Sequence, residues 1–168
     1  MQPVSPDALT GLAVDILAEL SRLRVLTDDI LAVQREIERD PAHARLFYEN
    51  LALKLHNFYT GCERIFQTVA SELNGGWPTG FDWHRRLLER MGTTWQGRPA
   101  LLSATSVESL REYLAFRHVV RHIYGFELDV DRVRRLTERY PQVWQQVEAD
   151  VLRFVGWLET LSRQLAES

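Results

Sequence analysis

The stretch Leu51–Phe66 reads Leu-Ala-Leu-Lys-Leu-His-Asn-Phe-Tyr-Thr-Gly-Cys-Glu-Arg-Ile-Phe, and its apolar side chains recur at intervals of three and four residues. This spacing predicts one buried face of an α-helix, because a half-buried strand would alternate at intervals of two. The same stripe continues in both directions: Leu46, Phe47, Leu51, Leu55, Phe58, Cys62, Ile65, Phe66, Val69 and Leu73. We therefore expect a long core helix that starts at Asp40-Pro41 and ends at Asn74-Gly75-Gly76.

The remaining segments show the same helical periodicity, and no period-2 run is bounded by turn residues. A first helix is expected from Pro6-Asp7 to Arg39-Asp40, since a proline disfavours helical geometry in the residue before it. Asp82 is a candidate cap for a short helix that ends at Met91-Gly92, and residues 92–104 suit an irregular loop.

Two more helices are expected in the C-terminal half of the chain. Thr105 and Glu108 have the spacing of a capping box, and Gly125 is the natural end of the helix that they open. Asp129 can cap a last helical region, in which Pro141 predicts a kink or a break. Short connections favour antiparallel neighbours, so the sequence predicts an all-α, up-and-down helical bundle of four long helices plus a short one.

Length and composition place the chain among soluble proteins. Its 168 residues suit a single domain spanning residues 1–168, and no segment approaches the roughly 18 consecutive apolar residues that a membrane span needs. The N-terminus lacks a basic flank followed by an apolar run, so we expect no targeting peptide, a cytoplasmic location and no membrane partner.

Charge and cysteine content exclude several kinds of site. With a net charge of −3, the chain lacks the overall positive excess of a dedicated nucleic-acid binder, so any RNA contact has to be local. Cys62 is the single cysteine, which excludes an intramolecular disulfide and a multi-thiolate zinc site. Its place in the apolar stripe predicts a buried structural residue.

The fourth expected helix carries an unusual group of polar side chains. On a helical wheel Arg117, Arg121 and Tyr124 share the arc of the apolar positions Leu110, Tyr113, Leu114 and Val120. A buried guanidinium is costly without compensation, so this arc must meet a carboxylate, a solvent-filled cleft or a second subunit. His118 and His122 lie four residues apart on an adjoining face.

Position on the helix bears on the chemistry of His122. The negative end of the helix dipole favours its protonated form, whereas the neighbouring arginines oppose it. A histidine balanced in this way can titrate near neutrality, as acid–base catalysis requires.

At this point the chain resembles a known family. Arg117, four intervening residues, His122, one residue and Tyr124 form an R-x4-H-x-Y pattern that resembles the motif of HepT-like toxins in the HEPN superfamily. His118 fills the polar position that often follows the arginine. The stretch Leu51–Phe66 also looks like HepT-related sequences, so the resemblance covers most of the chain.

The resemblance implies an HEPN-like fold and a function. It implies the toxin of an HEPN/MNT toxin–antitoxin system, an endoribonuclease that works as a homodimer with the motif helices of two protomers facing each other across a cleft. The usual partner of such toxins is a minimal nucleotidyltransferase antitoxin of the MntA type, which transfers AMP to the motif tyrosine, here Tyr124. A dimer would also account for Arg117 on an apolar arc.

These residue types suit RNA cleavage without a metal or other cofactor. The 2′-hydroxyl of RNA can attack the adjacent phosphate if a base takes its proton, an acid protonates the leaving oxygen and cations stabilise the added charge. We assign acid–base work to His122 and phosphate binding to Arg117, with His118 assisting catalysis. Arg121 and Tyr124 are candidate RNA contacts. Two copies of His122, or one copy with a bound water, can supply both the base and the acid.

Three alternatives accompany this assignment. His118 and His122 have the spacing of two metal ligands, but no third ligand lies nearby in the sequence, and His84 or Glu112 would reach them only by folding. Glu63 can pair with Arg117 or Arg121 across the bundle, either as a structural ion pair or to orient the arginine. The domain can also be catalytically silent and bind a protein or a nucleotide as a dimer.

Overall fold

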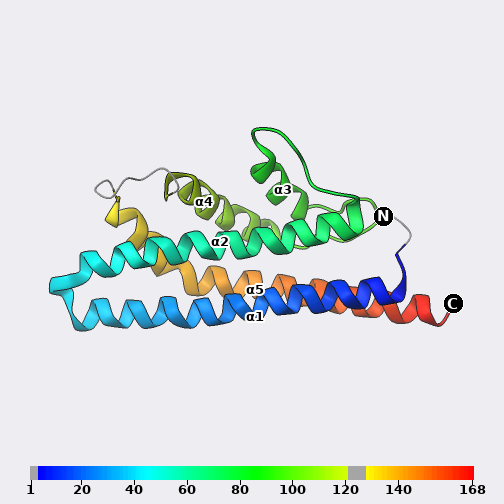
Figure 1. Cartoon of the computed structure of the whole chain (residues 1–168), viewed down its shortest axis with the longest axis horizontal. Helices are drawn as coiled ribbons and strands as arrows, with labels where there is room; N and C mark the ends of the chain where they lie inside the picture. Colours follow the sequence, from blue (N-terminus) through cyan, green and yellow to red (C-terminus); the bar gives the residue numbers. More distant parts are fainter. Residues whose placement is uncertain (1–3, 121–127) are drawn as a thin grey trace.

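The chain was analysed as a computed structural model that describes residues 4–120 and 128–168 (Figure 1). Its helices are α1 (Pro6–Arg39), α2 (Ala44–Asn74), α3 (Trp83–Met91), α4 (Ala104–Val120) and α5 (Val130–Ala166), with a 3-10 helix η1 (Pro41–His43) between α1 and α2. The described residues contain no β-strand beyond an isolated bridge between Trp95 and Arg98. The prediction of an all-α chain with four long helices and a short one is confirmed.

The four long helices form an up-and-down bundle (Figure 1). Helix α1 packs against α2 and α5, and α4 closes the bundle by packing against the same two helices from the other side. Successive long helices run in opposite directions (Figure 1). The short helix α3 lies outside this ring, where it contacts α2 and α4.

The turn between α1 and α2 differs from the sequence prediction. Asp40-Pro41 does not open α2 directly, because Pro41 begins the 3-10 helix and α2 starts three residues later, at Ala44. The backbone N–H of Asp40 still bonds to Glu36 and so closes α1. Two antiparallel helices need a tight reversal between them, and the shorter 3-10 turn supplies it. The predicted end of α2 is confirmed, with Gly75 left-handed at a φ of 70°.

The start of α4 also corrects the sequence prediction. Thr105 lies inside the first turn of α4, and the cap is Ser103, whose hydroxyl accepts a hydrogen bond from the backbone of Ser106 at 3.2 Å. Glu108 instead binds Arg111 one turn later, at 2.6 Å. The side chain of Asp129 does cap α5, as predicted.

Pro141 lies inside α5 without breaking it. A proline has no N–H, so it leaves the carbonyl of Thr137, four residues earlier, without its usual helical donor. The side chain of Gln34 on α1 donates to that carbonyl at 3.3 Å. The sequence predicted a kink or a break at Pro141; the break is wrong, in part because of this polar contact from another helix.

The bundle encloses one cluster of buried apolar side chains, to which all five α-helices contribute. Cys62 is among them and is buried, as its position in the apolar stripe predicts. None of the described helices combines the length and the apolar character that a membrane span requires.

Candidate functional site

Arg117 projects from α4 into the interior of the protein. It is only 8% exposed, and its neighbours on the same arc, Leu110, Tyr113 and Leu114, are buried as well. The helical wheel therefore placed this arginine correctly. A cation at this depth needs a partner, because a buried guanidinium without one is strongly destabilising.

Glu63 on α2 is that partner. Its Oε1 lies 3.0 Å from Nη1 of Arg117, and the two side chains are 5% and 9% exposed. Of the three surroundings that the sequence left open for the buried arc, the structure shows a carboxylate. The burial of Arg117 is thus compensated within one chain, without a second subunit.

His84, the second residue of α3, completes this cluster. Its Nδ1 lies 2.6 Å from Oε2 of Glu63 and 3.1 Å from Nη1 of Arg117. Sequence reasoning named His84 only as a distant metal ligand and missed its contact with the motif arginine. No local signal marks it, because the docking of the short helix α3 on α2 and α4 creates the contact.

Hydrogen-bond chemistry fixes where the proton of His84 lies. A single ring nitrogen cannot both donate to Glu63 and accept from Arg117. The shorter contact runs to a carboxylate, which only accepts, so Nδ1–H donates to Oε2 of Glu63. The guanidinium of Arg117 then donates to Oε1 of Glu63. Its Nη1 lies close to Nδ1 of His84 because both nitrogens donate to the same carboxylate.

Two aromatic rings set the plane of the His84 imidazole. Trp83 stacks on it with ring centroids 3.6 Å apart, and His118 meets it edge to face at 5.5 Å. His118 is exposed at the surface of α4, one residue after the buried Arg117. The structure therefore brings together Glu63, His84, Arg117 and His118 from three helices.

Unused polar atoms lie close to the ion pair. Nε of Arg117 and the hydroxyl of Tyr59 are buried, and neither has a hydrogen-bond partner among the described residues. Burial raises the pKa of Tyr59 far above its usual range, and the negative charge of Glu63 acts in the same direction. Tyr59 is thus a neutral phenol beneath the cluster. Glu63 contacts Nη1 of Arg117 and leaves the buried Nε without a partner among the described residues.

The other predicted motif residues, Arg121, His122 and Tyr124, lie outside the described residues, as does the predicted helix end at Gly125. Within residues 4–120 and 128–168, no group of three or more histidine, cysteine, aspartate or glutamate side chains is arranged to hold a metal ion.

A groove of about 330 Å³ runs between α4 and α5, near the start of α5. Arg111 lines it from α4, and Arg132 and Arg135 line it from α5. Arg132 and Arg135 make no ion pair with any described residue, and Arg132 lies over the ring of Phe116 at 5.7 Å. Despite the negative net charge of the chain, this groove is locally basic.

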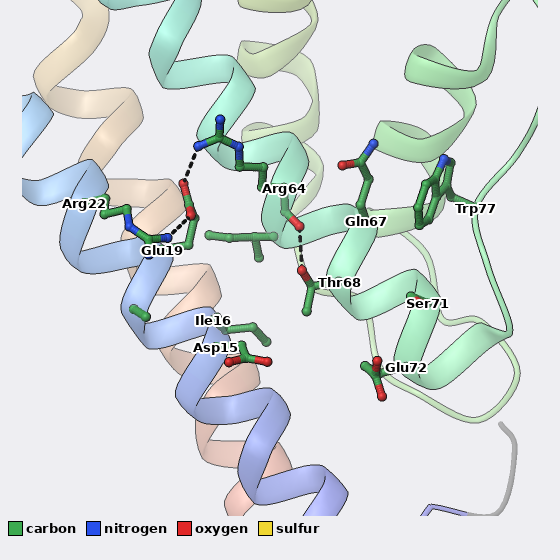
Figure 2. Close-up of a pocket in the computed structure, with 12 residues that line it drawn as sticks. Asp15, Ile16, Glu19, Arg22, Arg64, Gln67, Thr68, Ser71, Glu72 and Trp77 are labelled. Atoms are coloured by element: carbon green, nitrogen blue, oxygen red, sulfur yellow. Dashed lines mark hydrogen bonds and ion pairs between the residues drawn. The ribbon is translucent and has the colours of Figure 1, made fainter.

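A second groove, of about 530 Å³, lies between α1 and α2 (Figure 2). Its polar centre is Glu19, which lies 2.6 Å from Arg22 and 3.6 Å from Arg64 (Figure 2). Both of its arginines therefore pair with Glu19 inside the groove. None of the residues of the Arg117 cluster lines it, so we do not assign it to the same site.

Comparison with known proteins gives one match. A family model described as HepT-like protein matches residues 50–158, which is more than half of the chain and includes α3, α4 and most of α2 and α5. No curated protein and no solved structure matches the chain.

Proposed function

Since the chain belongs to the HepT-like family, we propose that it is a metal-independent endoribonuclease, the toxin of an HEPN/MNT toxin–antitoxin pair. The observation that carries this proposal is the buried Arg117, whose Nη1 Glu63 holds in place at 3.0 Å. A pre-oriented guanidinium of this kind suits a phosphate, whose oxygens accept forked hydrogen bonds.

The proposed reaction is cleavage of RNA through its own 2′-hydroxyl. The 2′-oxygen attacks the adjacent phosphorus, the bond to the 5′-oxygen breaks, and the products end in a 2′,3′-cyclic phosphate and a 5′-hydroxyl. Arg117 stabilises the charge on the phosphate, and His122 protonates the leaving 5′-oxygen. His118 assists, and Arg121 adds a phosphate contact.

The basic groove between α4 and α5 gives the RNA strand a path. Single-stranded RNA is held largely through its phosphates, which a row of arginines attracts. Arg132 and Arg135 are available for this role because no described carboxylate pairs with them. A local groove also accounts for RNA binding by a chain whose net charge is −3.

Cleavage of total RNA by the purified protein tests the proposed function. We expect cleavage in excess EDTA, cyclic phosphate ends, and loss of cleavage and of cellular toxicity in His122→Ala and Arg117→Lys. Lysine keeps the charge but not the forked geometry. Arg64→Ala, on the α1 side of α2, is the matched control and should cleave normally. Activity that needs added zinc or magnesium contradicts the proposal, and intact RNA in every assay favours a silent, partner-binding domain.

Regulation by a minimal nucleotidyltransferase antitoxin is part of the proposal. With ATP, the antitoxin transfers AMP to the phenolic oxygen of Tyr124, and the added bulk and negative charge repel RNA from the site. Mass spectrometry of the co-expressed proteins should place one AMP on Tyr124, and Tyr124→Phe should escape both modification and inhibition. Full inhibition of unmodified Tyr124→Phe contradicts this mechanism. The active form is proposed to be a homodimer, which sedimentation of the purified protein tests.

A further inference from the structure

We propose that His84 is a catalytic residue of this site: Glu63 holds its Nδ1–H, and its Nε2 takes the proton from the attacking 2′-hydroxyl. The inference rests on the proposed ribonuclease function and adds a group from outside the R-x4-H-x-Y motif. It provides the base that RNA cleavage needs within a single chain, next to the phosphate-binding Arg117.

The two nitrogens of His84 have different surroundings. Nδ1 is occupied by Glu63 at 2.6 Å, whereas Nε2 has no hydrogen bond to any described residue. The side chain is 14% exposed, so the ring is mostly enclosed and yet reachable at one edge. Trp83, stacked on one face of the ring, restricts its rotation. Nε2 is therefore an oriented acceptor.

The charged and titratable groups that face His84 come from its own helix and from two others. Helix α2 contributes Glu63, and α4 contributes Arg117 and His118. The charged residues beside it at the start of α3, Asp82, Arg85 and Arg86, pair among themselves. Glu63 and Arg117, which both contact Nδ1, carry opposite charges and pair with each other at 3.0 Å.

Proton uptake by His84 is matched to the substrate. When Nε2 takes a proton, the buried cluster gains one positive charge, and Glu63 stabilises the imidazolium through Nδ1–H. A bound phosphate brings the compensating negative charge.

The proposed step balances in atoms and charge. The proton of the 2′-hydroxyl moves to Nε2 of His84 as the 2′-oxygen bonds to phosphorus. The bond from phosphorus to the 5′-oxygen breaks, and that oxygen takes a proton from the acid of the proposed function, His122. Solvent then returns both histidines to their starting forms, and no redox partner is required.

A structural role for His84 predicts the same hydrogen bond, so the test must separate the two ring nitrogens. In His84→Asn the amide N–H lies at the place of Nδ1–H and can still donate to Glu63, but nothing replaces Nε2. His43→Asn is the matched control, because His43 makes a similar bond to Asp40 at 2.8 Å in the exposed turn after α1.

We expect His84→Asn to lower kcat at least about 100-fold, a typical share of general base catalysis, with little change in KM or melting temperature. It should also lose the rise in rate with pH that deprotonation of a base produces, and added imidazole should restore part of the rate. His43→Asn should match the unchanged protein in every measurement.

Three outcomes overturn the inference. If His84→Asn cleaves within about threefold of the wild type and keeps its pH profile, His84 only supports the structure. If its defect disappears on RNA with a 5′-sulfur leaving group, which needs no protonation, His84 is the acid and not the base. If the unchanged protein does not cleave RNA, the proposed function itself fails, and the inference fails with it.

Discussion

Removing the charge of Glu63 should cost much more stability than removing the charge of an equally well paired surface carboxylate. Glu63→Gln keeps the shape of the side chain but leaves Arg117 as an unbalanced cation that is 8% exposed. Breaking a buried pair on one side costs about 3–5 kcal/mol. At roughly 2–4 °C per kcal/mol for a chain of this size, the melting temperature should fall by about 10 °C.

Glu112→Gln is the matched control, because distance alone would rank its ion pair as the stronger one. Both carboxylate oxygens of Glu112 lie 2.8 Å from Arg139, but each side chain is 53% exposed. Exposed pairs contribute at most about 1 kcal/mol. Urea unfolding at pH 7 measures both variants. Equal midpoints for Glu63→Gln and Glu112→Gln would refute the argument that burial, and not distance, makes the Glu63–Arg117 pair important.

Three further predictions follow from single contacts. Burial acts to raise the pKa of Asp150, but hydrogen bonds from two serines at the start of α4 hold it below its usual range. The stability that the Asp150 carboxylate contributes is therefore present at neutral pH and lost as the pH falls below about 4. Asp150→Asn should lower the free energy of unfolding by roughly 2 kcal/mol at pH 7 and flatten the acid unfolding curve. Gln34→Ala should lower the free energy of unfolding in urea by about 1 kcal/mol, but by nearly nothing in a Pro141→Ala background, where the carbonyl of Thr137 regains a helical donor. Equal losses in both backgrounds contradict this. Replacing Arg132 and Arg135 by alanine should weaken RNA binding in a filter-binding assay. The slope of the logarithm of the binding constant against the logarithm of the salt concentration should become shallower by about 1.4, whereas an unchanged slope places the RNA elsewhere.

Much of the fold could be predicted because its signals are local. The apolar spacing of α2 from Leu51 to Leu73 and the glycines after it determine the buried face and the end of the helix, whereas Leu46, predicted in the same stripe, is 62% exposed. The same spacing predicts that Arg117 lies on a buried arc, and Arg117 is 8% exposed. Where a competing cap stood nearby, the prediction was wrong: Ser103, two residues before Thr105, caps α4 instead.

The predictions that failed depend on contacts between distant segments. The backbone N–H of Ser103 is bound by Asp150, 47 residues later in the chain. Pro141 is accommodated in an unbroken α5 with the help of Gln34, 107 positions earlier by number, whose side chain serves the carbonyl that the proline leaves open. His84 belongs to the candidate site only because α3 packs on α2 and α4. Periodicity along one helix carries no information about any of these contacts.

The buried arginine bears on the proposed dimer. Two protomers that met through bare guanidinium groups would repel each other in a partly desolvated interface. The Glu63–Arg117 pair removes that obstacle inside each chain, because the two charges cancel before any partner arrives. In the proposed reaction, the RNA phosphate binds the guanidinium of Arg117 and His84 takes the proton of the 2′-hydroxyl. The same carboxylate thus serves the stability of the single chain and the proposed chemistry, and this is why its removal should affect both.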